Sequence, residues 1–216
     1  MILGKMNFRE LDQKWIAFCN KKDIKKICKK FKIAFEDGIL LGYGYINHEK
    51  GLKIKIAGFV SKENDIYSID QELIFKKSSI VFSKKLKYKV DKVDNSIVDK
   101  IEHCDQLMIH FESYYQKKAI VESRKIAEID EFRHETFIDD VELTLNTGKN
   151  SEYLWARIED CSINDKVFVC SLLENSEYNK KYKVNTLVLA KVLDNKKKKS
   201  FVIDYIVDIV KKEKQD

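Results

Sequence analysis

The last third of the chain has apolar residues at every second position, and this period restricts the possible folds more than any other feature. Such alternation covers residues 153–159, 166–173 and 184–193, and less regularly 201–210. Successive side chains of a strand point to opposite faces, so these runs predict strands with one buried face. Four or five short strands with tight connections predict a small curved sheet or partly closed barrel. Residues 201–210 also fit a terminal helix, because their apolar positions satisfy either period over part of the length.

A second group of alternating runs lies in the first half of the chain. Residues 41–45 place a leucine and two tyrosines on one face of a strand, and 52–56 alternate apolar residues with lysines. The intervening HEKG (48–51) predicts the turn of a hairpin. An antiparallel meander results. Further strands are expected near 66–75, 79–83 and 86–90.

Two helices are predicted before this meander. The first would place four apolar residues on one stripe, with Asn7 as its N-cap. The second covers residues 23–31 and would be apolar on one side and basic on the other. The apolar stripe of the first is formed by Phe8, Leu11, Trp15 and Phe18, and that of the second by Ile24, Ile27, Cys28 and Phe31.

A long helix is predicted after the meander, beginning at Asp94 or Ser96. Its apolar residues alternate steps of four and three, which is the spacing of a heptad seam. A continuation over 118–134 keeps Ile126, Ile129 and Phe132 in phase, with a kink or break near Lys117. The seam itself contains Ile97, Ile101, Cys104, Met108, Phe111 and Tyr115.

These elements together predict an α+β protein of two domains. Residues 138–146 have strand character, and TGKNSE (147–152) is the one stretch that resembles a linker. We therefore expect an α+β domain of N-terminal helices, β meander and long helix over 1–146. A small β-rich domain, curved or partly barrel-like, follows over 147–216.

Composition indicates a cytoplasmic protein without a membrane segment. The longest uncharged run, at 38–47, is far shorter than the roughly 20 residues of a membrane span. The start of the chain lacks the apolar stretch and cleavage site of a secretory signal. The five cysteines form no C-x-x-C pair, so we expect reduced and mostly buried thiols.

No recognised catalytic or metal-binding pattern is present in the sequence. His103 and His110 lie seven residues apart, whereas helical zinc pairs use spacings of three or four. The run GYGYIN at 42–47 lacks the third glycine of a phosphate loop, and strand packing explains it better. Acidic residues at 128–132, with Asp139 and Asp140, are expected as solvated charges rather than cation ligands. We therefore predict no enzymatic activity, no metal and no cofactor.

The lysine-rich helix is the most distinctive charged feature. Its lysines crowd a short stretch that only Asp23 interrupts, and a row of this kind can contact phosphates. A solvated face is the more ordinary interpretation, and no base-reading motif accompanies the row. The lysines are Lys21, Lys22, Lys25, Lys26, Lys29, Lys30 and Lys32.

Trp155 is the second distinctive residue. In a regular strand it shares a face with Tyr153 and Arg157, while Leu154, Ala156 and Ile158 occupy the other face. Because most tryptophans are substantially buried, we expect core packing for Trp155. The alternative is a contact surface formed by Trp155 and Arg157.

The same region carries a family resemblance over about residues 150–208. Glu152 precedes Trp155 by three residues, LLENS follows at 172–176, and VNTLVLAKV follows at 184–192. This order resembles a family of small uncharacterised bacterial β domains found near polymorphic-toxin immunity genes. In that family a Trp-bearing strand precedes a Leu-x-Asn-Glu-Pro segment and a Gly-Asp-x-Val strand. In this chain Ser176-Glu177 replace the Glu-Pro pair, and Val184-Asn185-Thr186 replaces Gly-Asp. The resemblance implies an immunity-type role and no catalytic residues.

These observations favour a non-enzymatic protein-interaction protein of bacterial or phage origin. The expected role is an immunity-type or defence-related inhibitor that covers the surface of a protein partner. The alternative is a nucleic-acid-binding module that uses the lysine-rich helix 21–32. The heptad seam could pack on its own sheet or on a second copy, so oligomeric state is left open.

Overall fold

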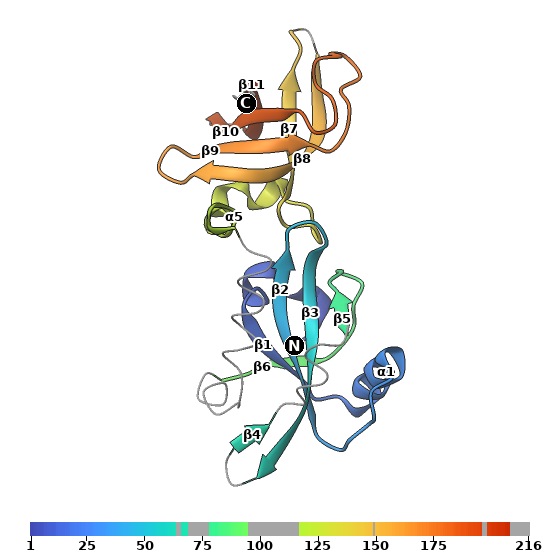
Figure 1. The fold of residues 1–216 in the computed structure, drawn as a ribbon. Helices are drawn as coiled ribbons and strands as arrows, with labels where there is room; N and C mark the ends of the chain where they lie inside the picture. The colour runs from blue at the N-terminus through green and yellow to red at the C-terminus, as the bar shows by residue number, and fades with distance from the viewer. Residues whose placement is uncertain (64–65, 69–77, 95–116, 149, 196–197, 208–216) are drawn as a thin grey trace, which may run out of the picture. The chain divides into compact units, whose positions relative to one another are not determined.

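The computed structural model describes the chain except for residues 64–65, 69–77, 95–116, 149, 196–197 and 208–216 (Figure 1). The chain divides into two compact units. Unit 1 contains Met1–Gln116 and Glu135–Phe137, and unit 2 contains Lys117–His134 and Ile138–Asp216. The described part of the chain is mostly β, with few and short helices. The helical share predicted for an α+β fold is therefore too large there.

Unit 1 is built on an antiparallel sheet with the strand order β4-β3-β2-β1-β6, and β5 pairs with β3. Two short 3₁₀ helices, η1 (Leu3–Lys5) and η2 (Phe8–Glu10), precede the sheet, and α1 (Lys21–Phe31) follows β1. The strands are β1 (Lys14–Phe18), β2 (Ile39–Asn47), β3 (Gly51–Glu63), β4 (Ile66–Ser68), β5 (Ser79–Val81) and β6 (Val90–Lys92).

The predicted first helix is wrong, because only its start is helical and its second half forms strand β1. Asn7 does cap a helical turn, in a capping box with Glu10, but that turn is the short η2. Gln13 then takes a positive φ of 57°, and β1 pairs on one side with β2 and on the other with β6. Residues 15–18 are all buried, as in a strand covered on both faces. Such a strand shows no alternation, so its apolar residues match a helical stripe by coincidence.

The second predicted helix and the hairpin are confirmed. Helix α1 buries Ile24, Ile27 and Cys28. Strands β2 and β3 pair from Ile39–Val60 to Asn47–Gly51 around the expected turn. Gly44 lies in β2 where the Cβ of any other residue would approach the carbonyl oxygen of Leu11 to 1.9 Å. Close backbone packing therefore explains this glycine.

The predicted meander is only partly correct. Its strands are antiparallel, but β1 lies between β2 and β6, so chain order and sheet order differ. Residues 87–89 alternate in burial, although regular pairing is limited to Val90–Lys92. Strand β4 is described only over Ile66–Ser68. Sheet order depends on pairing between distant segments, which local alternation does not encode.

The long predicted helix is only partly covered by the structure. Its heptad seam, residues 97–115, lies outside the described residues. The expected continuation over 118–134 is instead a short helix, α5 (Lys118–Ser123), and a 3₁₀ helix, η3 (Ala127–Phe132). Ile126, Ile129 and Phe132 recur every three residues, which is the period of a 3₁₀ helix. They pack against the core of the barrel in unit 2.

Unit 2 is a closed β-barrel with the strand order β10-β11-β7-β8-β9, and β9 pairs with β10 (Figure 1). Neighbours in the chain pair antiparallel, whereas the closing pair, β11 with β7, is parallel. An up-and-down sheet of five strands returns its last strand in the direction of its first, so closure requires a parallel pair. The strands are β7 (Asp140–Asn146), β8 (Ser151–Ser162), β9 (Val167–Leu172), β10 (Leu187–Asn195) and β11 (Lys198–Ile206).

The strands predicted for the last third are confirmed. Residues 201–206 are strand rather than helix, and 208–210 lie outside the described residues. The barrel goes beyond the expected partial closure. Its core is apolar and includes Leu154, Ala156 and Ile158 of β8, with Phe168 and Phe201 edge to face at 5.0 Å.

The linker predicted at 147–152 lies within a hairpin. Strands β7 and β8 pair from Asp140–Arg157 to Asn146–Ser151, and Gly148 has a φ of +81° in the turn between them. The structure therefore places residues 138–146 in unit 2, where the sequence predicted a boundary at 147. The polar turn residues have the composition of a linker, and only strand pairing distinguishes the two cases.

A buried ion pair joins α5 to the start of β7. The Arg124 guanidinium donates from Nε and Nη2 to the two carboxylate oxygens of Asp139, at 2.9 and 2.8 Å. These side chains are exposed by only 4% and 0%. Arg133 adds hydrogen bonds from Nη1 to the Ile138 carbonyl and from Nη2 to the Ser123 carbonyl, both at 2.7 Å. The helical segment is therefore a fixed part of unit 2.

Candidate functional site

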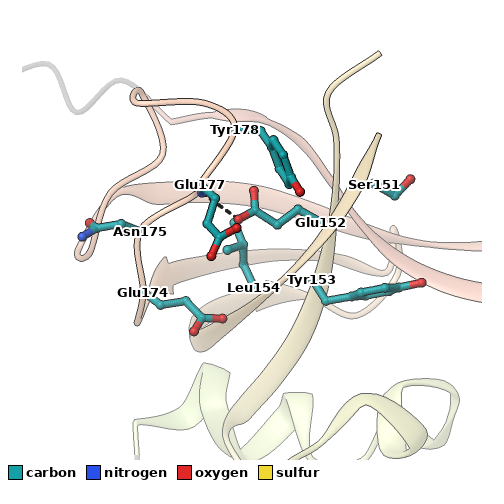
Figure 2. Close-up of a pocket in the computed structure, with 8 residues that line it drawn as sticks. All are labelled: Ser151, Glu152, Tyr153, Leu154, Glu174, Asn175, Glu177 and Tyr178. Carbon is teal, nitrogen blue, oxygen red and sulfur yellow. Dashed lines mark hydrogen bonds between the residues drawn. The ribbon is translucent and has the colours of Figure 1, made fainter. Parts of the chain in front are cut away.

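The segment between β9 and β10, residues 173–186, is held against β8 by the side chain of Glu152. The two carboxylate oxygens of Glu152 accept hydrogen bonds from the Ser176 hydroxyl at 2.5 Å and from the Glu177 backbone N–H at 2.7 Å. Figure 2 shows the bond from Glu177 as a dashed line. Hydrogen bonds to a charged acceptor are among the stronger ones in proteins. Glu152 therefore fastens the loop to the barrel wall.

Further hydrogen bonds determine the shape of this loop. The Ser176 hydroxyl oxygen accepts from the backbone N–H groups of Tyr178 and Asn179, at 3.2 and 2.9 Å. Glu174 accepts from the Trp155 N–H at 2.7 Å, and Asn175 accepts from the Val184 N–H at 3.0 Å. Side chains thus satisfy backbone groups that no strand pairs, which is how irregular loops become ordered.

The anchored loop borders a hollow of about 370 Å³ on the surface of unit 2. Tyr153 and Tyr178 line it and are more than half exposed, at 53% and 59%. Figure 2 shows the carboxylates of Glu152 and Glu177 close together beside Tyr178, with Glu174 lower on the same loop. We call this region the tyrosine–glutamate groove. Its lining is Ser151, Glu152, Tyr153, Leu154, Glu174, Asn175, Glu177 and Tyr178.

The structure corrects the expectation for Trp155, which lies on the outer face of the barrel rather than in its core. Leu154 and Ala156 on either side face the core, so strand alternation directs Trp155 outward. The indole is half-buried because the His134 ring packs edge to face against it at 5.4 Å. Trp155 lies next to the groove, because its backbone N–H donates a hydrogen bond to the carboxylate of Glu174.

Arg157 also faces outward, but its charge is matched within unit 2. Its Nε and Nη2 donate to Asp140 at 2.7 and 3.1 Å. The prediction of solvated acidic residues is wrong for Asp139 and Asp140, which are both buried in ion pairs with arginines. Acidic residues in 128–132 are paired as well. Glu128 pairs with Lys166 at 2.6 Å, and Asp130 lies 3.4 Å from Arg133. These carboxylates serve internal ion pairs.

All seven lysines predicted as a basic surface are exposed. Lys21 pairs with Asp37 at 2.8 Å, and its ammonium lies 5.7 Å from the centre of the Phe35 ring. The Lys25 ammonium lies 5.2 Å from the same ring. Lys32 takes the left-handed conformation that ends α1. These lysines belong to unit 1, whereas the tyrosine–glutamate groove belongs to unit 2.

The described cysteines are free thiols, two buried, one half-buried and one exposed. Burial raises the pKa of the Cys28, Cys161 and Cys170 thiols, which favours their neutral form. Among the residues that the structure describes, no group of three or more His, Cys, Asp or Glu is arranged to hold a metal ion. His103 and His110 lie outside the described residues.

No family model, no curated protein and no solved structure matches this chain. In the described part of the chain, no helix is long and apolar enough to cross a membrane.

Trp155 and Arg157 could be singled out from the sequence, but the way the groove is built could not. Glu152 and Ser176 were recognised only as parts of a pattern, and nothing local indicated that they bind each other across 24 positions. The signal available was the polar run 174–179, rich in residues whose side chains bind nearby backbone groups. That composition predicts an ordered loop, but its contact with β8 depends on the barrel.

Proposed function

We propose that this protein is a non-enzymatic protein-binding protein, an inhibitor of bacterial or phage origin that covers the surface of its partner. The observation that carries the proposal is the ordered loop 173–186. It exposes Leu173, Tyr178 and Val184, while its backbone N–H groups donate hydrogen bonds to the side chains of Glu152 and Ser176. Loops that are ordered before binding lose less conformational entropy when a partner docks.

The chemistry of the groove supports this function. Tyrosine supplies a large, rigid contact area at low entropic cost and is enriched at protein interfaces. Tyr153 and Tyr178 provide two such side chains beside three glutamates. Opposite charge on a partner increases the rate of association and favours the correct orientation. The partner we expect therefore presents a basic surface with an apolar centre.

The resemblance of residues 150–208 to domains found near toxin immunity genes supports an immunity-type role. In such a role the partner is a toxin encoded beside this protein. Binding rather than chemistry would then neutralise the toxin, so a complex of defined stoichiometry is expected.

The test is a calorimetric titration of the purified protein with the product of the neighbouring gene. We expect a dissociation constant on the order of nanomolar, as in other inhibitory complexes. Replacing both Tyr153 and Tyr178 with Ser should weaken binding by about 100-fold or more. Tyr205→Ser is the matched control, because Tyr205 is also 53% exposed but lies in β11, outside the groove lining.

Two results would overturn the proposal. One is equal affinity of the double tyrosine variant and the wild-type protein. The other is purification of the protein from its native host at low salt without any stoichiometric protein partner.

A further inference from the structure

Helix α1 presents an unbroken row of lysines to solvent. Ile24, Ile27 and Cys28 face the interior, so the outward positions at 22, 25, 26, 29 and 30 all carry exposed lysines. At a rise of 1.5 Å per residue, the row from Lys22 to Lys29 extends about 10 Å. Each turn of the helix adds at least one ammonium group to the same surface.

The one acid within this helix is turned toward the protein. Asp23 is 13% exposed, and its carboxylate accepts a hydrogen bond from the Lys89 backbone N–H at 3.0 Å. This bond places residue 89 beside the first turn of α1. Tyr88 packs edge to face on Phe18 at 6.1 Å, while Lys87 and Lys89 are exposed. The basic surface therefore extends beyond the helix. We define it as the lysine surface: Lys22, Lys25, Lys26, Lys29, Lys30, Lys87 and Lys89.

Little of this charge is cancelled by neighbouring acids. Within the part of the chain that the structure describes, ion pairs on α1 involve Lys21 with Asp37 and Lys26 with Asp23, the latter at 4.0 Å. Like charges on successive turns repel one another slightly. An anionic ligand would relieve this repulsion.

The composition of the surface favours nucleic acid over an acidic protein. Lysine is depleted at protein interfaces, where Tyr, Trp and Arg are enriched, whereas interfaces with nucleic acid are strongly positive. Two phenylalanines lie within cation–π distance of lysines of α1: Phe35 near Lys21 and Lys25, and Phe31 near Lys30. Lysine acts on phosphate as a point charge without reading base identity.

From these observations we infer that unit 1 binds the phosphate backbone of nucleic acid, without sequence preference, through the lysine surface. This binding is a separate activity from the proposed protein binding and does not depend on it. Each phosphate contact releases condensed counterions, so affinity falls steeply with salt concentration. Four contacts to a duplex would give a slope of log K against log salt of about −3.6.

The experiment is fluorescence anisotropy of the full chain with a labelled 30-base-pair DNA duplex between 50 and 200 mM NaCl. The test variant is Lys25→Gln with Lys29→Gln, which removes two charges from the middle of the row. The matched control, Lys180→Gln with Lys181→Gln, removes two charges from exposed lysines of unit 2. Circular dichroism verifies that both variants remain folded.

We expect the test variant to lose about tenfold or more in affinity at 50 mM salt and to flatten the salt slope by about two. The control should lose less than threefold. Duplexes of unrelated sequence should bind equally, and Tyr153→Ser with Tyr178→Ser should leave DNA binding unchanged, which separates this proposal from the previous one.

Three outcomes would overturn the inference. They are a salt-independent affinity, equal losses in the test and control variants, and tighter binding of a polyglutamate peptide than of DNA. The last result would assign the lysine surface to an acidic protein partner.

Discussion

The two units of this protein organise their cores differently. The barrel of unit 2 is closed, its core cluster is apolar, and its ion pairs lie around that core, as with Arg124 and Asp139. The sheet of unit 1 is open. In its strand β2 the backbone of Gly44 packs closely against the backbone of Leu11, and in β3 the side chain of Lys55 is buried. In the closed barrel, charged side chains lie outside the apolar core. In unit 1, by contrast, a charged side chain and a closely packed glycine both lie within the sheet.

The chain provides a natural probe for this comparison. Its two tryptophans, Trp15 and Trp155, lie in different units. Trp155→Phe leaves Trp15 to report on unit 1, and Trp15→Phe leaves Trp155 to report on unit 2. Denaturation followed by fluorescence in these two backgrounds assigns each change in stability to a unit.

The largest effect is expected for Gly44→Ala in unit 1. A Cβ at this position would approach the Leu11 carbonyl oxygen to 1.9 Å, so the backbone must move. We expect a loss of about 4 kcal/mol or more in the free energy of unfolding, measured with urea and Trp15 fluorescence. The control is Gly148→Ala in unit 2, where nothing lies within 4 Å but φ is positive. It should cost about 1–2 kcal/mol. Equal losses would contradict steric exclusion as the reason for Gly44.

A loss of about 3–5 kcal/mol is expected in unit 2 for Asp139→Ala. Without this carboxylate the Arg124 guanidinium is left buried without its ionic partner. Urea denaturation followed through Trp155 measures the change. Lys166→Ala breaks the exposed pair with Glu128 and should cost far less than Asp139→Ala, because water and salt screen exposed charges. A small effect of Asp139→Ala would mean that the buried pair is not what holds α5 to the barrel.

Lys55 makes the stability of unit 1 depend on pH. Burial lowers the pKa of Lys55 from its ordinary value of 10.5 to about 8, while the ammonium donates to the Ser78 hydroxyl at 3.2 Å. Between pH 8 and 10.5 the unfolded chain therefore binds more protons at this site than the folded protein. The contribution of Lys55 to the free energy of unfolding therefore rises with pH between pH 8 and 10.5, by up to about 3 kcal/mol.

Lys55→Met tests this dependence. The variant should be more stable than wild type at pH 7. Its free energy of unfolding should not show the rise between pH 8 and 10 that is expected for the wild-type protein. Urea midpoints of the Trp15 signal at several pH values measure both. Lys53→Met is the comparison, because that neighbour in β3 is more exposed and should change the profile less. Identical pH profiles of wild type and Lys55→Met would reject the buried charge as their origin.

The smallest effect concerns the start of α1. The Asn20 side chain accepts hydrogen bonds from the backbone N–H groups of Lys22 and Asp23, at 3.0 and 3.2 Å. Asn20→Ala should cost about 1 kcal/mol in unit 1, measured by urea denaturation. Asn20→Asp keeps an acceptor and should lose less. If both variants lose the same amount, capping is not the cause.

Local features were predictable from the sequence and nonlocal ones were not. The β2–β3 hairpin, helix α1 and the strands of the last third were found because each depends on a period of two or 3.6 within one segment. Strand β1 was mistaken for a helix, since a strand buried on both faces has no alternation. Residues 147–152 were mistaken for a linker, since a hairpin turn and a linker share polar composition.

The tyrosine–glutamate groove also combines local features that the sequence predicts with a nonlocal contact that it does not. The shared strand face of Trp155 and Arg157 and the polar character of the loop follow from alternation and composition, whereas the outward direction of that face does not. The contact of Glu152 with Ser176 joins residues that meet only after β8 and β9 have paired within the barrel.

By itself the sequence determined which segments alternate, that residues 23–31 are helical and which face of that helix is basic, because these properties depend on neighbouring residues. Only the tertiary structure decided that β1 enters the sheet between two distant strands, that five strands close into a barrel, and that Trp155 faces outward. Those outcomes depend on which distant segments bury each other's apolar faces. Alternative pairings differ in free energy only when the contacts of the whole chain are included.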